Sequence, residues 1–293
     1  MNHLRIIECA TGLIAYYDGR VPDYRFKPGP NWVDDGALSL GIASYALISA
    51  DKALVYDTHV SVDHAKFIRA DLERRGVKHF TVLLSHWHLD HVAGTAAFAD
   101  CEIISTAKTL AHLKLRRGSI EDGSFHGPPA IMPLILPTRI FEGDMYFELG
   151  NMKLKFIETN IHSDDASVVW RESDRLLLAG DTMEDTITYV GEPQDFDIHL
   201  SELERLWAFN PEFIFPNHGS PDIIAVGGYG KGLIKAQSQY IRMLKRCRDD
   251  ETLRKIQLKE LISGPLKMGW VNYFQPYEEV HTQNLQRVVS VSN

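Results

Sequence analysis

The sequence predicts a layered α/β protein, and two observations support that prediction. Short apolar segments typical of strands occur in both halves of the chain, with helical segments between them. The 293 residues also have an ordinary composition, 44% hydrophobic and 24% charged, which excludes disordered, collagen-like and coiled-coil classes. Strands interleaved with helices in a chain long enough to bury a large core indicate sheets covered by helices.

The first half predicts two strands, a helix and a third strand. Residues 44–57 have the pattern of two short strands joined by a turn at Asp51–Lys52. A helix capped by Asp63 and ended by Gly76 should follow, with one apolar face made of Ala65, Ile68 and Leu72. A buried strand is expected next, at Phe80–Leu84.

The middle of the chain predicts a long loop and then more strands. A small-residue helix is expected over 92–100, followed by an irregular surface loop over 115–137. Long loops in compact domains are often binding loops, so Phe125, His126 and Pro128 are candidates to border a pocket. A hairpin at 149–151 precedes strands expected at 152–158, 167–170, 175–179 and 213–215.

The chain is expected to divide into a core at 1–225 and a helical extension at 226–293. Leu233, Tyr240, Leu244 and Cys247 recur at helical spacing in that extension. It also holds an aromatic group that could form a lid, a dimer contact or simple core: Trp270, Tyr273, Phe274 and Tyr277. A homodimer is therefore an alternative that the sequence leaves open.

Charge and targeting signals exclude several kinds of partner. The net charge of −8 lacks the basic footprint of a nucleic-acid binder. The apolar runs fall short of the roughly 20 residues that span a bilayer, and the start lacks a signal-peptide pattern. We therefore expect a cytoplasmic protein that binds a small molecule, not nucleic acid or a membrane.

Histidine is abundant (13 residues) and cysteine scarce (3), and the histidines are placed systematically. Residues 86–91 read HWHLDH and follow the apolar segment TVLL. His162, Asp181 and His218 likewise lie beyond the apolar segments KLKFI, RLLLA and FIF. If these strands are neighbours, their carboxyl ends bring all of these side chains to one rim.

This set of side chains predicts a site for two divalent metal ions. In an extended segment His86, His88 and Asp90 point one way and His91 points the other, so one segment can serve two ions. Three histidines suit one ion, two histidines with a carboxylate suit a second, and another carboxylate can bridge both. Imidazole and carboxylate donors without thiolate fit zinc, with iron and manganese as alternatives.

These motifs resemble the metallo-β-lactamase superfamily over roughly residues 40–220. The marks are the strand-ending Asp57, the HxHxDH signature, His162, Asp181 and His218. The resemblance implies an αββα sandwich with the metal site at one edge and Asp57 as a nearby structural acid. It implies one ion held by His86, His88 and His162. It implies a second held by Asp90, His91 and His218, with Asp181 bridging both.

The resemblance further implies a binuclear metal-dependent hydrolase. The hypothesis is that a metal-bridging hydroxide attacks a carbonyl carbon, with Asp181 holding both ions and Asp90 relaying the proton. True metallo-β-lactamases lack the bridging Asp, so Asp181 argues against antibiotic hydrolysis. The expected substrate is a small acyl ester, thioester or lactone. The alternatives are a phosphodiesterase of the same superfamily or a metal-bound regulator with little turnover.

Two groups within the superfamily are the most similar. Acyl-homoserine lactonases share the seven ligands but carry a catalytic Tyr three residues after the bridging Asp, where this chain has Glu184. Tyr189 could approach from the same loop and is the third catalytic candidate, beside Asp90 and Asp181. Thioesterase-like proteins of alkylquinolone signalling resemble the chain in the HSDD segment at 162–165, in Glu184 and Asp185, and in a helical tail.

Overall fold

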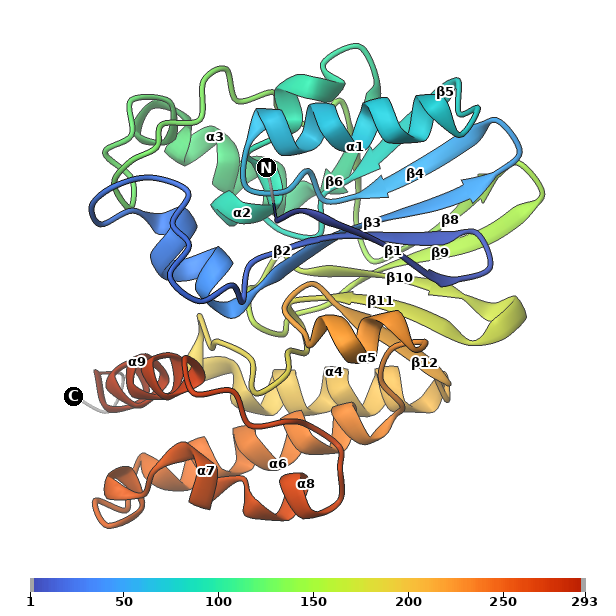
Figure 1. The fold of residues 1–293 in the computed structure, drawn as a ribbon. Helices are drawn as coiled ribbons and strands as arrows, with labels where there is room; N and C mark the ends of the chain where they lie inside the picture. Colours follow the sequence, from blue (N-terminus) through green and yellow to red (C-terminus); the bar gives the residue numbers. More distant parts are fainter. Residues whose placement is uncertain (1–2, 291–293) are drawn as a thin grey trace.

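Two β-sheets packed face to face form the centre of the protein, and helices cover both outer faces (Figure 1). The computed structural model describes residues 3–290. The predicted α/β class and the αββα sandwich are therefore confirmed, together with the helical C-terminal extension.

The first sheet has seven strands in sequence order. They are β1 (Arg5–Ala10), β2 (Leu13–Asp18), β3 (Ile42–Ser49), β4 (Lys52–Tyr56), β5 (His79–Leu83), β6 (Glu102–Thr106) and β7 (Arg139–Phe141). Pairing is antiparallel from β1 to β4 and parallel from β4 to β7. The carboxyl ends of β4 and β5 consequently lie side by side at one edge.

The second sheet has five strands in the order β12-β11-β10-β9-β8. They are β8 (Asp144–Leu149), β9 (Met152–Glu158), β10 (Ser167–Arg171), β11 (Leu176–Gly180) and β12 (Phe213–Pro216). β11 and β12 are parallel, and β10 runs antiparallel to both β9 and β11. β9, β11 and β12 therefore all end at the same edge, which is the edge where the predicted ligands follow them.

Three apolar clusters hold these layers together. The cluster between the sheets includes Tyr45, Leu54, Phe156, Leu178 and Phe215, all completely buried. Burial of aliphatic and aromatic side chains contributes roughly 1.5–3 kcal/mol for each one. The other two clusters lie between each sheet and its covering helices. Central strands such as β4, β10 and β11 are thus buried on two faces, as an αββα sandwich requires.

Helices from the two halves of the chain cover opposite faces. The first sheet is covered by α1 (Val62–Arg74), α2 (Leu89–Val92) and α3 (Ala107–Glu121). The second is covered by α4 (Phe196–Ala208), α6 (Gly232–Cys247) and α9 (Tyr277–Ser290). The shorter helices are α5 (Pro221–Ala225), α7 (Leu258–Leu261) and α8 (Ser263–Lys267), with a π-helical turn at Val33–Leu38.

The extension packs directly on the sandwich. α6 carries the predicted apolar stripe, with Leu233, Tyr240, Leu244 and Cys247 all buried. It packs against α4 and α9. The division at residue 225 stays a prediction. Of the predicted aromatic group only Tyr277 is fully buried. Within residues 3–290, no helix is long and apolar enough to cross a membrane.

Three local predictions were wrong. Ser61, not Asp63, caps α1, because its side chain accepts a hydrogen bond from the His64 backbone N–H. The first part of the expected loop is the end of α3, so the irregular segment begins at Asp122. The expected small-residue helix over 92–100 is only a short 3₁₀ turn at Thr95–Phe98, after α2 has ended at Val92.

Candidate metal centre

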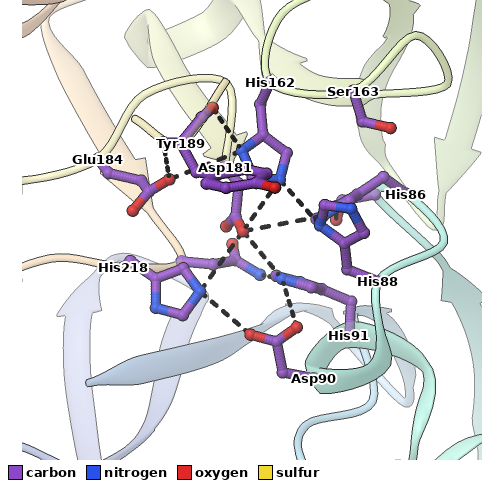
Figure 2. Close-up of polar contacts among 12 residues, drawn as sticks. His86, His88, Asp90, His91, His162, Ser163, Asp181, Glu184, Tyr189 and His218 are labelled. Carbon is purple, nitrogen blue, oxygen red and sulfur yellow. Dashed lines mark hydrogen bonds and ion pairs between the residues drawn. The ribbon is translucent and has the colours of Figure 1, made fainter. Parts of the chain in front are cut away.

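All seven side chains predicted as metal ligands meet at the edge where the strands end (Figure 2). His86 and His88 follow β5, and Asp90 and His91 lie on α2, the single helical turn after them. His162 follows β9, Asp181 follows β11 and His218 follows β12. Parallel strand ends therefore position side chains that are more than 130 residues apart in sequence, from His86 to His218.

The first group is three histidines. The Nδ1 atom of His88 lies 2.9 Å from Nε2 of His86 and 3.0 Å from Nε2 of His162. Burial lowers the pKa of His162 to about 4 and holds the pKa values of His86 and His88 well below their ordinary value. The three rings are therefore neutral, the form that binds a metal ion.

The second group combines two histidines with a carboxylate. Nε2 of His218 lies 3.2 Å from Oδ2 of Asp90, and Nε2 of His91 lies 3.6 Å from Oδ1. Burial alone would lower the pKa values of both histidines, but Asp181 and Asp90 hold them well above the ordinary value. The surrounding carboxylates thus favour positive charge at this position.

Asp181 lies between the two groups. Its Oδ2 atom is 3.1 Å from His91 Nε2 and 3.4 Å from His218 Nε2, and 3.7–3.8 Å from the Nε2 atoms of His86 and His162. Burial would raise its pKa, but His91 and His218 hold it well below the ordinary value. Its other oxygen, Oδ1, is buried without a hydrogen-bond partner. An ionised carboxylate with an unpartnered buried oxygen is what a bridging ligand requires.

Hydrogen bonds on the outer side of the rings fix their orientation. Nδ1 of His91 donates to Oδ2 of Asp57 at 2.8 Å, and Nδ1 of His218 donates to the Gly41 carbonyl at 2.7 Å. Nδ1 of His162 donates to the Tyr189 carbonyl at 3.1 Å. Because these three rings donate through Nδ1, it is their Nε2 atoms that face the centre, as in metal-ligating histidines.

The donor set fits metal ions because protons alone leave the first group unsatisfied. If His162 donates through Nδ1, its Nε2 can only accept, and a proton on His88 Nδ1 can serve only one of its two neighbours. A cation between the three nitrogens satisfies all of them at once. Every ligand atom is nitrogen or oxygen, which suits zinc and also iron or manganese.

The expected extended conformation from His86 to Asp90 was wrong. The segment from His86 is not extended as far as Asp90, because α2 begins at Leu89. Asp90 and His91 are therefore neighbours on one helical turn, and both side chains reach the group that contains His218. The helix, rather than strand alternation, divides the segment between the two groups.

Two residues of the centre have unusual backbone conformations. Asp57 has φ +66° and His162 has φ +71°, in the left-handed region that non-glycine residues rarely adopt. Asp57 accepts further hydrogen bonds from the Ser85 backbone N–H at 2.7 Å and from the Asn217 amide at 2.6 Å. These bonds hold a strained residue in place, and they agree with a supporting role for Asp57.

A cavity of about 290 Å³ opens beside the seven side chains. His88, Asp90, His162, Asp181 and His218 line its floor. Phe125 and His126 border it, as the sequence predicted for their loop, whereas Pro128 does not. The volume is near the small end of the range for small-molecule sites, which is about 300–1,000 Å³.

The loop after β11 brings Glu184 and Tyr189 to the same cavity. The Tyr189 ring centroid lies 5.7 Å from that of His162 and 6.5 Å from that of His88. Burial raises the pKa of Glu184 to about 8, and its Oε1 atom lies 3.7 Å from Nδ1 of His162. Tyr189 thus borders the centre, and its hydrogen bond to a predicted ligand, His162, is through its backbone carbonyl.

The C-terminal extension holds this loop by a set of buried hydrogen bonds. Gln237 of α6 accepts from the Thr188 backbone N–H at 2.9 Å and donates to the Glu184 carbonyl at 2.6 Å. Asn284 of α9 accepts from the Val190 backbone N–H at 2.8 Å and donates to the Thr188 carbonyl at 3.0 Å. Side chains of α6 and α9 therefore supply the hydrogen-bond partners that a helix or sheet would otherwise give to the backbone of this loop.

Tyr277 adds a direct link from α9 to the cavity. Its hydroxyl donates to Oε2 of Glu184 at 3.0 Å, and both side chains are buried. The sequence marked Tyr277 only as part of an aromatic group. Its partner is 93 residues away, and no local pattern joins the two positions. The extension is thus part of the site's construction.

The sequence analysis did not identify most of the residues that form the wall of the cavity above the predicted ligands. Trp32 and Leu40 come from the segment between β2 and β3, and Glu279 and Val280 come from α9. These positions carry no motif, because apolar side chains that line a cavity look the same in sequence as side chains that fill a core. The position of ligand-type residues directly after apolar segments was the local signal available.

A two-sheet sandwich with a nitrogen- and oxygen-donor centre at its strand ends defines a class of metal-binding α/β protein. The family model described as the metallo-beta-lactamase superfamily matches residues 39–218. The chain belongs to the metallo-beta-lactamase superfamily.

Curated relatives and solved structures agree with that assignment. The chain is 23% identical over 270 residues to the linear primary-alkylsulfatase of Pseudomonas sp. (strain ATCC 19151), covering 74% of this chain and 50% of that protein. It is 27% identical over 169 residues to the beta-lactamase-like protein 2 homolog of Caenorhabditis elegans, covering 56% and 51%. The chain thus spans about half the length of the curated relatives it matches.

The similarity to solved structures supports the fold. A metallo-beta-lactamase from Pontibacter korlensis superposes with a TM-score of 0.61 at 13% identity, covering 82% of this chain and 99% of that one. The DIM-1 metallo-beta-lactamase gives 0.59 at 16% identity, covering 82% and 97%. At these identities the comparison shows a shared architecture and leaves the substrate to be argued from the site.

Proposed function

We propose that the protein is a metal-dependent hydrolase with two divalent ions. In this proposal His86, His88 and His162 hold one ion, and Asp90, His91 and His218 hold the other. Asp181 bridges them. The observation that carries the proposal is the position of Asp181 Oδ2, within 3.8 Å of a histidine nitrogen from each group, with Oδ1 left unpartnered.

Two divalent ions, when bound, would make hydroxide available near neutral pH and stabilise negative charge on a substrate oxygen. The chain's own residues supply the rest. The Asp90 carboxylate, half-buried and open to the cavity, accepts a proton and passes it to the leaving oxygen or sulfur. Tyr189, on the cavity wall, donates a hydrogen bond from its hydroxyl to the substrate.

The proposed substrate is a small acyl ester, thioester or lactone. A cavity of about 290 Å³ favours a small molecule over a polymer. A sulfate ester is a second candidate, because a relative of this chain is named as an alkylsulfatase. Among the described residues that line the cavity there is no Lys or Arg to hold a sulfate, so we rank it below the acyl substrates.

The test combines metal analysis with a turnover screen. Purified protein should contain close to two zinc ions, or iron or manganese, per chain. It should hydrolyse acyl thioesters or lactones faster than hexyl sulfate or a phosphodiester, and chelation should abolish this activity. His88→Ala should lower metal content and turnover together. Full activity in metal-free protein would refute the proposal, and tight ligand binding without any turnover would favour a regulator.

A further inference from the structure

The cavity beside the candidate centre has one wall made of apolar side chains. Trp32, Leu40, Trp87 and Phe125 contribute from the first half of the chain, and Val280 contributes from α9. The Trp87 ring lies 5.6 Å from the Phe125 ring, and the Trp32 indole is held by a hydrogen bond to the Pro129 carbonyl at 3.0 Å. Ordered aromatic rings offer a rigid apolar surface at low entropic cost.

The charged groups on this wall are acidic. Asp35 and Glu279 line the cavity beyond the seven predicted ligands. Asp35 is balanced by Arg25, whose guanidinium lies 2.9 Å away, whereas Glu279 accepts a hydrogen bond from the uncharged Gln283 amide. The guanidinium groups of Arg116 and Arg287 stack on Trp87 and Tyr189 without lining the cavity. Glu279 therefore places an unneutralised negative charge beside the apolar surface.

We propose that the substrate carries an uncharged apolar group, which binds between the aromatic wall and Val280, and that Glu279 selects against analogues with an anionic group there. This inference rests on the proposed function and deepens it by naming the part of the substrate that does not react. It also makes α9, which lies outside the matched family region, the element that determines specificity.

The expected size of the preference follows from burial and charge. Each methylene that moves from water to the wall should improve binding about fourfold until the cavity is filled. A carboxylate placed near Glu279, which is exposed, meets like-charge repulsion that solvent and salt screen in part. That repulsion should weaken binding by about tenfold at low salt and less at high salt.

The first experiment measures kcat/KM for N-acetylcysteamine thioesters with acetyl, butanoyl and hexanoyl groups, and for the adipoyl thioester. Adipoyl matches hexanoyl in length but ends in a carboxylate. The expected result is a rise along the neutral series and at least tenfold preference for hexanoyl over adipoyl. Equal or better turnover of adipoyl would overturn the inference.

Variants test which residues cause the preference. Glu279→Gln should reduce the hexanoyl-to-adipoyl ratio about threefold, and Glu279→Lys should reduce it further or invert it. Glu172→Gln removes an exposed acid that does not line the cavity and should leave the ratio unchanged. A ratio that is the same in the wild type and in Glu279→Lys would contradict the role of Glu279.

A second pair of variants tests the apolar wall. Val280→Ala should lower kcat/KM for hexanoyl about threefold while leaving acetyl nearly unchanged. Val226→Ala, at a valine that is 83% exposed and outside the cavity, should change neither. A uniform loss on all acyl groups in Val280→Ala would show a general folding effect and would overturn this part of the inference.

Binding without chemistry separates failure of this inference from failure of the proposed function. Titration calorimetry would compare hexyl methyl ketone with its analogue bearing a terminal carboxylate, neither of which can be hydrolysed. Tighter binding of the neutral ketone, with a negative heat-capacity change, would support the inference even if every thioester resisted hydrolysis. No preference between the two ketones, together with no thioester turnover, would overturn both proposals.

Discussion

The floor and the wall of the cavity differ in the kinds of side chains that form them and in where those residues lie in the sequence. The floor belongs to a centre of seven polar side chains at the ends of β5, β9, β11 and β12, five of which line the cavity, and the matched family region contains all seven. The wall takes Leu40, Trp87 and Phe125 from that region, and Trp32 and Val280 from segments outside it. The proposed reacting centre therefore lies wholly within the matched family region, whereas the wall also draws on segments outside that region.

The largest effect is expected from Asp181→Ala in the floor. Removing the one carboxylate that lies between both groups takes away the proposed bridge. Metal content should fall towards zero, and kcat/KM should fall by more than the roughly 10–100-fold usual for outer partners of metal ligands. Elemental analysis and initial rates measure this. A variant with two bound ions and full activity would contradict the assignment of the reacting centre to the floor.

Asp57→Asn should have the next largest effect, through His91. The Asp57 carboxylate accepts the Nδ1 proton of His91. An asparagine that presents its NH₂ group to Nδ1 could not accept that proton. Metal affinity, measured by competition with a chelator, should fall by roughly 10–100-fold. Asp18→Asn is the matched control, because Asp18 is a buried acid that pairs with His64 at 3.0 Å rather than with a predicted ligand.

Tyr277→Phe tests the link between the wall and the floor. Loss of the hydroxyl leaves Oε2 of Glu184 buried without its donor, which should cost about 1–3 kcal/mol in unfolding free energy. It should also lower kcat/KM, because the loop with Glu184 and Tyr189 loses one support. Tyr45→Phe, which loses a bond to the Pro216 carbonyl between the sheets, should affect stability more than turnover. Equal turnover losses in both variants would remove the special role of α9.

Asp71→Asn should have the smallest effect on the cavity. Burial would raise the pKa of Asp71, but hydrogen bonds from Arg75, Tyr16 and Arg74 lower it below its ordinary value of 3.8. Its ionised form therefore stabilises the folded protein above pH 3.8, and that contribution is lost as the pH falls through the folded-state pKa. Urea unfolding should show a loss of about 1–2 kcal/mol at pH 7 that shrinks in acid, with metal content unchanged.

The floor could be predicted from the sequence because its signal is local. HWHLDH, His162, Asp181 and His218 each follow an apolar strand, and sheet geometry then brings the strand ends together. The layered α/β class was predictable for the same reason, and the αββα sandwich followed from the resemblance to the superfamily. The failure at Asp90 was also local, because the helical turn that starts at Leu89 has no marker in its sequence.

The wall could not be predicted because its contacts are long-range. Glu184 and Tyr277 are 93 residues apart, and Thr188 and Asn284 are 96 residues apart. From the sequence, Val280 indicates only that one face of the helix at 277–290 is apolar. Which surface covers that face depends on how the extension docks, and that follows from the packed structure. The spacing of residues along the chain can indicate metal ligands, but it does not indicate which distant segments pack together.

The left-handed backbone at Asp57 and His162 has a consequence for how such a site is maintained. A non-glycine residue in this conformation costs about 1 kcal/mol or more, and glycine would remove that cost. Selection for stability alone would therefore favour glycine at His162, whereas glycine at Asp57 would leave the buried donors of Ser85, Asn217 and His91 without their acceptor. The protein keeps an imidazole at His162, so the cost there is a trade of stability for function. Laboratory evolution for heat resistance without selection for activity should lose the His162 side chain before that of Asp57.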